Sequence, residues 1–352
     1  MRAARSRRPR EPRWPIRALD RASLARSPRW VFGVAAVTWL SILLVYHALA
    51  LGVEAIRSVG LEVAWFEGVH VLMIAYTPAA LVYGLRGARL DLHALRPALR
   101  LSEAQFRDRL RALVTFNGAH LVSLTALLVA VSQLPLFVGP SPSPSWPEGR
   151  PPLGDPRMTW IMLRSAVVVL LLAPLVYTEL TVARRFSNLG ETCAAVDLLD
   201  PTRLAPFARH GLRSVLIWTG LTVLTSLLFL VSWAQSTARV ALVLILVAAT
   251  AVMLLPVRGV HRRLREEKQS ELERVRAALR AERDAQLSAR AGAGGTSARL
   301  ANLIAYEQRI ESARTWPFDP GTLLRFALYV TLGVGSWLGG AVVERLLGLL
   351  LD

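Results

Sequence analysis

Three polar side chains of types that bind metals lie within long apolar stretches of this sequence. Glu67 and His70 are three residues apart, so a helix would place them on one face. His47 lies in the preceding apolar stretch, and the three would converge if the two helices were neighbours. This pattern raises the hypothesis of a metal or haem site. The alternative is that water or lipid headgroups satisfy all three near the membrane surface.

A second set of polar residues lies toward the opposite ends of the apolar stretches. Pro78 and Pro174 would kink two helices and leave backbone carbonyl groups free of helical partners. A polar vestibule near these kinks is expected to be lined by Tyr83, Asn117, His120, Tyr177 and Glu179.

Glu179 is the acidic member of this vestibule, and two interpretations apply to it. With His120 it would form a relay for protons or cations. It would be a structural residue if it paired instead with Arg184 or Arg185 on the same helix. Arg164, near the other end of that helix, is expected to extend its side chain to the outer headgroups.

Motifs of the common enzyme classes are absent from the sequence. There is no phosphate-binding Gly-x-x-x-x-Gly-Lys-Ser/Thr loop, no His-Glu-x-x-His, no Gly-x-Ser-x-Gly and no Cys-x-x-Cys. Cys193 is the only cysteine, so no disulfide forms within the chain. We therefore expect a protein that is not an enzyme and needs no cofactor.

The 352-residue chain gathers its apolar residues into long runs. Hydrophobic residues make up 53% of it, and the mean hydropathy is +0.39. A helix needs about 20 apolar residues to cross the hydrocarbon core of a bilayer. The sequence predicts an all-α fold, a polytopic transmembrane bundle of about seven spans. The expected spans are residues 31–53, 62–85, 112–138, 159–182, 212–234, 238–258 and 323–343.

Basic residues indicate the side of the membrane on which each connecting segment lies. The chain has 42 Lys and Arg against 25 Asp and Glu, a formal net charge of +17. Of the 42, 35 lie in the N-terminal tail and after the second, fourth and sixth spans, whereas four lie in the other connections. The positive-inside rule then places the N-terminus in the cytoplasm and the C-terminus outside. This distribution favours a bacterial inner membrane with anionic headgroups as the partner. Because topology accounts for the basic residues, we expect no binding to nucleic acid.

The six-span membrane domain, residues 31–258, is expected to contain two helices that lie along the inner membrane interface. Ser102 and Gln105 have the spacing of a capping box that begins the first of them, residues 103–112. The second covers residues 201–211. Apolar side chains on both are expected to face lipid.

Three further parts complete the chain: a basic cytoplasmic tail at residues 1–30, a cytoplasmic helical hairpin at 259–315, and the seventh span with a short end at 316–352. The hairpin would pack on other cytoplasmic segments, on a second copy, or on a partner protein. The last span has small residues that permit close helix approach and would favour a homo-oligomer. These are Gly335, Gly339 and Gly340.

The two halves of the membrane domain have a similar order of features. Each has a proline followed by Leu-Val-Tyr, then an arginine-rich segment, an expected interfacial helix and a span. An internal duplication would produce this order. The alternative is that helical hairpins in general look alike at this level.

Three functions are compatible with these features. The kinked helices and inner polar residues favour a transporter or oligomeric channel for a small solute or ion. The hairpin favours a membrane-embedded sensor or scaffold that binds a cytoplasmic protein. His47, Glu67 and His70 would support a haem or metal redox protein. Transport is the preferred expectation.

Overall fold

A computed structural model describes residues 27–50, 52, 60–138, 154–230, 235–288 and 294–313, with single positions from 316 to 335. These residues form helices joined by turns, with one isolated β-bridge and no strand. Short 3₁₀ turns occur at Arg96–Ala98, Pro201–Leu204 and Leu227–Leu230. The α-helices are α2 (Pro28–Ala50), α4 (Leu61–Leu95), α5 (Glu103–Ala112), α6 (Gly118–Val138), α7 (Pro156–Cys193), α8 (Ala205–Ser226), α9 (Gln235–Ser288) and α10 (Gly294–Ser312).

Four helices in the described part are long and apolar enough to cross a membrane. They are α2, α4 with the turn that follows it, α7, and the Ile245–Ala285 portion of α9. Helix α6 contributes a shorter apolar segment, Gly118–Gln133. Most of the last expected span, with Gly339 and Gly340, lies outside the described residues. An all-helical protein with several candidate membrane helices is therefore confirmed.

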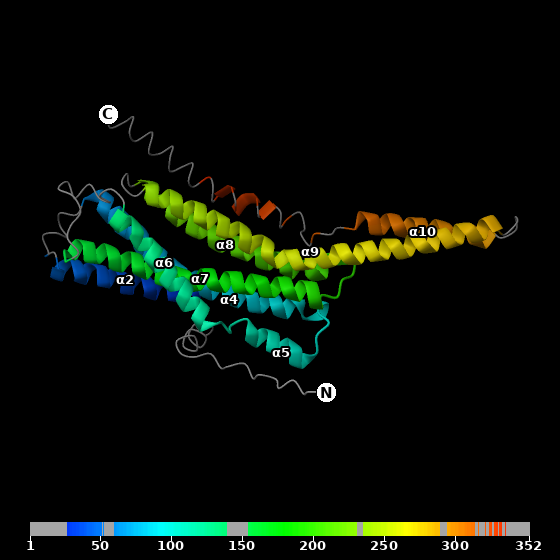
Figure 1. Ribbon diagram of the computed structural model, residues 1–352, viewed down its shortest axis with the longest axis horizontal. Helices are drawn as coiled ribbons and strands as arrows, with labels where there is room; N and C mark the ends of the chain where they lie inside the picture. Colours follow the sequence, from blue (N-terminus) through cyan, green and yellow to red (C-terminus); the bar gives the residue numbers. More distant parts are fainter. Residues whose placement is uncertain are drawn as a thin grey trace, which may run out of the picture.

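The long helices pack as a ring. Helix α4 packs on α8, α8 on α9, α9 on α7 and α7 on α4, while α2 adds to α4 and α6 adds to α7 (Figure 1). Apolar faces line this ring, and its largest fully buried side chains include Trp218 and Phe186. The ring brings the C-terminal halves of α4 and α7 close to the N-terminal half of α8. We call this end of the ring its inner end.

The inner end of the ring holds the largest apolar core cluster, and this cluster corrects an expectation about the interfacial helices. Phe106 of α5 and Leu113, which follows this helix, are buried in it. Leu204 and Phe207 are also buried there, although the sequence predicts that apolar side chains of this segment face lipid. The amphipathic pattern is real, but protein covers the apolar faces because the C-terminal ends of α4 and α7 and the middle of α9 converge at this level.

Two predicted boundaries between helices are wrong. Residues 205–211 do not form a separate interfacial helix, because α8 continues from Ala205 to Ser226 without a break. No break separates the sixth expected span from the first helix of the expected hairpin either, since α9 runs through Pro256 as one helix of 54 residues. A proline removes one backbone hydrogen bond, and neighbouring helices support the backbone around it.

Side chains cap the starts of α5 and α7, and the cap of α5 has the predicted geometry. Ser102 and Gln105 form the complete capping box of α5, each side chain bonded to the other residue's backbone N–H. Asp155 accepts the Arg157 N–H at 2.7 Å at the start of α7. Asp200 differs, because it makes no backbone cap and accepts instead from the Thr202 hydroxyl.

Helix α10 lies antiparallel along the distal part of α9, and together they form a segment that we call the arm (residues 268–288 and 294–312). Arg276 binds Glu307 at 2.7 Å and Glu311 at 2.6 Å. Lys268 donates to the backbone carbonyl of Glu311 at 2.6 Å. The arm extends beyond the ring at the end where the inner core lies (Figure 1).

Helices α7 and α9 cross closely at two glycines. A Cβ on Gly259 would collide with the backbone oxygen of Ser187. A Cβ on Gly190 would lie 2.8 Å from the backbone nitrogen of Val260. Because backbone atoms cannot move aside as flexible side chains do, this crossing requires glycine at both positions.

We predict that Gly259→Ala lowers the stability of the protein by about 1–3 kcal/mol, the usual cost of overpacking. The matched control is Gly68→Ala, a helical glycine in α4 where an added methyl group would have no atom of the described residues within 4 Å. Thermal unfolding in mild detergent measures both. Equal melting temperatures for the two variants would contradict the close crossing.

Candidate functional site: buried charges between helices

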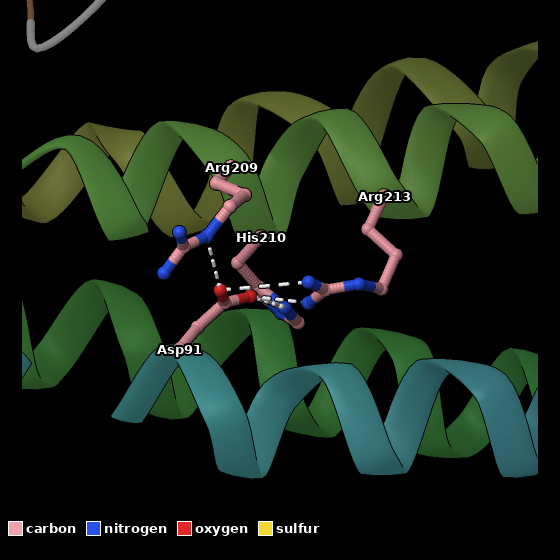
Figure 2. A network of polar contacts seen from close by, with 4 residues as sticks. All are labelled: Asp91, Arg209, His210 and Arg213. Carbon is pink, nitrogen blue, oxygen red and sulfur yellow. Dashed lines mark hydrogen bonds and ion pairs between the residues drawn. The ribbon is translucent and has the colours of Figure 1, made fainter. Parts of the chain in front are cut away.

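A buried carboxylate joins α4 to α8 at the inner end of the ring. The Asp91 side chain is fully buried, and its Oδ1 accepts from Arg209 Nε at 2.7 Å. Arg213 binds the other carboxylate oxygen through one guanidinium nitrogen and lies 3.5 Å from Oδ1 through the second. Figure 2 shows the carboxylate between these two arginines, with His210 beside them.

Helical spacing explains why α8 presents these groups together. Arg209, His210 and Arg213 occupy positions i, i+1 and i+4, so all three project toward the same side of α8. On α4, Gly87 lies one turn before Asp91, and a Cβ there would collide with the Arg213 guanidinium group. The glycine therefore leaves the space through which Arg213 reaches the carboxylate.

His210 fills the third side of Asp91 without binding it closely. Its Nδ1 is 3.9 Å from the carboxylate, and its ring stacks on Phe186 at a centroid distance of 4.1 Å. Neither ring nitrogen has a hydrogen-bond partner among the described residues. The stacking on Phe186 is therefore the contact that holds the ring beside Asp91.

Glu179 of α7 extends the cluster to a third helix. It accepts a hydrogen bond from Ser214 and lies within the electrostatic reach of Arg213. A Cβ on Gly84 would be only 2.6 Å from Glu179 Oε1, so the carboxylate packs directly on the α4 backbone. Its Oε2 is buried and finds no hydrogen-bond partner in the part of the chain that the structure describes. Arg213 thus stands between two buried carboxylates from different helices.

A second buried ion pair lies at the other end of α4. Arg164 of α7 binds Glu67, and Trp160 donates to the same carboxylate oxygen at 3.0 Å. The Arg164 guanidinium carbon lies 4.4 Å from the centre of the Phe66 ring. Arg164 is only 5% exposed, so its expected extension toward the headgroups is wrong. The acidic partner on a neighbouring helix holds it inside.

The candidate metal residues do not converge. Among the described residues, which include His47, Glu67 and His70, no group of metal-binding side chains could hold an ion. His70 Nδ1 bonds to the Phe66 carbonyl at 2.7 Å, and His47 Nδ1 to the Leu43 carbonyl at 2.9 Å. Each histidine is therefore held by its own helix, which leaves the metal hypothesis without a ligand set.

The five expected vestibule residues lie in two different places. Tyr83 lies beside Arg213, whose guanidinium carbon is 5.9 Å from the ring centre, on the side where Glu179 is buried. Tyr177 instead contacts Phe116 near the start of α6. Asn117 caps α6 by accepting the Ala119 N–H at 3.0 Å, and both Asn117 and His120 are exposed.

Glu179 does not pair with Arg184 or Arg185 of its own helix, as the structural interpretation proposed. Arg184 is exposed, and Arg185 donates to the carbonyls of Ala112 and Thr115 at the end of α5. Arg213 of α8 is the cation near Glu179.

A Cβ on Gly335 of the last expected span would meet no atom of the described residues within 4 Å, so no close helix contact is seen there.

The residues that sequence reasoning missed are Asp91, Arg209 and Arg213. Membrane topology alone accounts for the two arginines in the sequence. One signal was available: Asp91 is the only acid in the arginine-rich residues 86–100, and Gly84 and Gly87 precede it on the same helical face.

No family model, curated protein or solved structure matches this chain.

We predict that Asp91→Asn destabilises the protein by about 3–5 kcal/mol, because it leaves Arg213, which is mostly buried, without its counter-charge at Asp91. Asp108→Asn is the matched control, since the Asp108 side chain is 74% exposed. Thermal unfolding of the purified variants measures the difference. Adding Arg213→Gln to Asp91→Asn should restore part of the loss, and a double variant less stable than the single one would argue against the pairing.

Proposed function

We propose that the protein is a transporter of a small solute or ion that opens alternately to the two sides of a bacterial inner membrane. In this proposal it has seven spans, a cytoplasmic N-terminus, an external C-terminus and a cytoplasmic arm. The observation that carries the proposal is the pair of buried ionic contacts at opposite ends of α4: Glu67 with Arg164, and Asp91 with Arg209 and Arg213.

The spacing of the two contacts matches a membrane. Glu67 and Asp91 are 24 residues apart on α4, which corresponds to about 36 Å along a helix. A bilayer has a hydrocarbon core of about 30 Å. Each contact would then lie near one face of the membrane, and each links α4 to a different helix, α7 at one end and α8 at the other.

The region between the contacts is suited to bending. Pro78 lies within α4 and Pro174 within α7, and both lie between the levels of the two ionic contacts. Proline removes a backbone hydrogen bond, so these helices bend there more easily. Opening one contact while the other stays closed is the behaviour that alternating access requires.

Buried ion pairs also have suitable energetics for this role. The attraction between the charges and the cost of removing them from water nearly cancel, so a closed pair and a hydrated, open pair differ little in free energy. A ligand or ion that binds one state more tightly would then shift the population. A fully apolar contact would lack this balance.

The test measures access to the middle of α4 without knowledge of the substrate. Thr77 is buried beside Pro78, and Thr77→Cys in a Cys193→Ser background provides a single thiol there. A membrane-impermeant maleimide is applied from outside in intact vesicles. We expect Glu67→Gln to raise the labelling rate about tenfold, the effect of shifting the closed state by roughly 1.4 kcal/mol.

The matched inner experiment uses Asp91→Asn with maleimide applied from the cytoplasmic side of inverted vesicles, and it should show the same increase there. Asp108→Asn, on an exposed residue of α5, is the control for both. Labelling that is unchanged in Glu67→Gln and in Asp91→Asn would contradict transport by alternating access. Increases from both sides in each variant would indicate general loosening and also count against it.

The arm supports a second candidate function, a membrane-embedded scaffold that binds a cytoplasmic protein. Its observation is the projection of α9 and α10 beyond the ring, held together by Arg276 with Glu307 and Glu311.

We predict that Arg276→Glu separates α10 from α9 and removes a co-purifying partner while Thr77→Cys labelling stays unchanged. Arg283→Glu, whose ion pair is with the adjacent Asp284, is the control. Retention of the partner by Arg276→Glu would contradict the scaffold function.

A further inference from the structure

An apolar groove of about 540 Å³ lies where α2, α4 and α8 meet. Its lining comes from the first residues of α2, the middle of α4 and the second half of α8. Three of its lining residues are small, Ala79 and Ala80 on α4 and Gly220 on α8. Tyr76 closes its base, since its hydroxyl donates to the Ile217 carbonyl at 2.7 Å.

One charged residue, Arg29, is present in the lining. It is exposed at the first turn of α2, and it makes no ion pair with any residue in the described part of the chain. No acidic side chain of the described residues lines the groove. The groove therefore combines an apolar body with a positive charge at the end of a helix.

The groove is shorter than the hydrocarbon layer of one leaflet, which is about 15 Å thick. From Tyr83 to Tyr76 it follows α4 for seven residues, about 10 Å along the helix, and it ends near the level midway between Glu67 and Asp91. Arg29 immediately follows the basic N-terminal tail, which the proposed orientation places in the cytoplasm. An anionic headgroup at Arg29 would thus have its chain directed into the groove.

We propose that this groove binds one anionic phospholipid of the cytoplasmic leaflet, with its phosphate at Arg29 and part of an acyl chain between α2 and α8. Charge and shape both favour this occupant. A phosphate satisfies Arg29 by charge-assisted hydrogen bonds, and an acyl chain needs no polar partner from Ala79, Ala80 and Gly220. An extended peptide segment would leave backbone groups unsatisfied against such a lining. Lipid binding here rests on the proposed orientation of the chain and does not depend on solute transport.

The experiment is native mass spectrometry of the delipidated full chain titrated with dioleoylphosphatidylglycerol or with dioleoylphosphatidylcholine. We expect the first bound lipid to show a preference of about fivefold for the anionic species, the effect of one basic residue near a membrane surface. Arg29→Gln should abolish this preference. Arg107→Gln, an exposed arginine on α5, should keep it.

A second variant tests the groove itself and does not alter its charge. Leu216 lines the groove and is 38% exposed, so Leu216→Trp fills the space from its open side. It should reduce the first bound lipid of either kind, whereas Leu170→Trp, at a residue 50% exposed on α7, should not. Melting temperatures near that of the wild type would show that both variants fold.

Three results would overturn the proposal. Equal binding of the two lipids by the wild type would remove the role of charge. Equal loss of preference in Arg29→Gln and Arg107→Gln would mean general attraction to a basic surface. Wild-type dimers that Leu216→Trp dissociates would assign the groove to a second copy of the chain.

Discussion

The packing of the inner half of this protein depends on one buried carboxylate. Asp91 has no contact with water, so it is compatible with folding only when cations from another helix reach it. Arg209 and Arg213 meet this need, and the contact determines how α8 lies against α4. Gly87 must then lack a side chain, because Arg213 occupies the space beside it. The apolar core at the same level closes around a contact whose geometry is already determined by charge.

A second consequence is the unequal role of the helices. Helix α4 takes part in both ionic contacts, whereas α7 and α8 each hold one end. Glu179 gives α7 a weaker connection to the inner contact through Ser214 and Arg213. A rearrangement at one end of α4 therefore need not disturb the other end. In the proposed transporter, this separation would allow each ionic contact to open by itself.

The sequence was informative about elements and poorly informative about pairing. Apolar runs located the long helices, and the capping box at Ser102 and Gln105 is present. The number of arginines is fully explained by membrane topology. Their count therefore gives no sign that Arg164 and Arg213 are buried partners of acidic residues. Such pairing depends on which helix faces which, and a single sequence has no local signal for it. Burial of the apolar face of α5 was missed for the same reason, since an amphipathic pattern does not say whether lipid or protein covers it.

The uninterrupted course of α9 makes it a lever with a fulcrum at Gly259. From this glycine to Ser288 there are 29 residues, about 44 Å of rigid helix beyond the crossing with α7. A tilt of only about 5° at the fulcrum would move the far end by about 4 Å, because no turn or loop lies between to absorb it. Small changes of packing inside the ring would therefore be magnified at the arm.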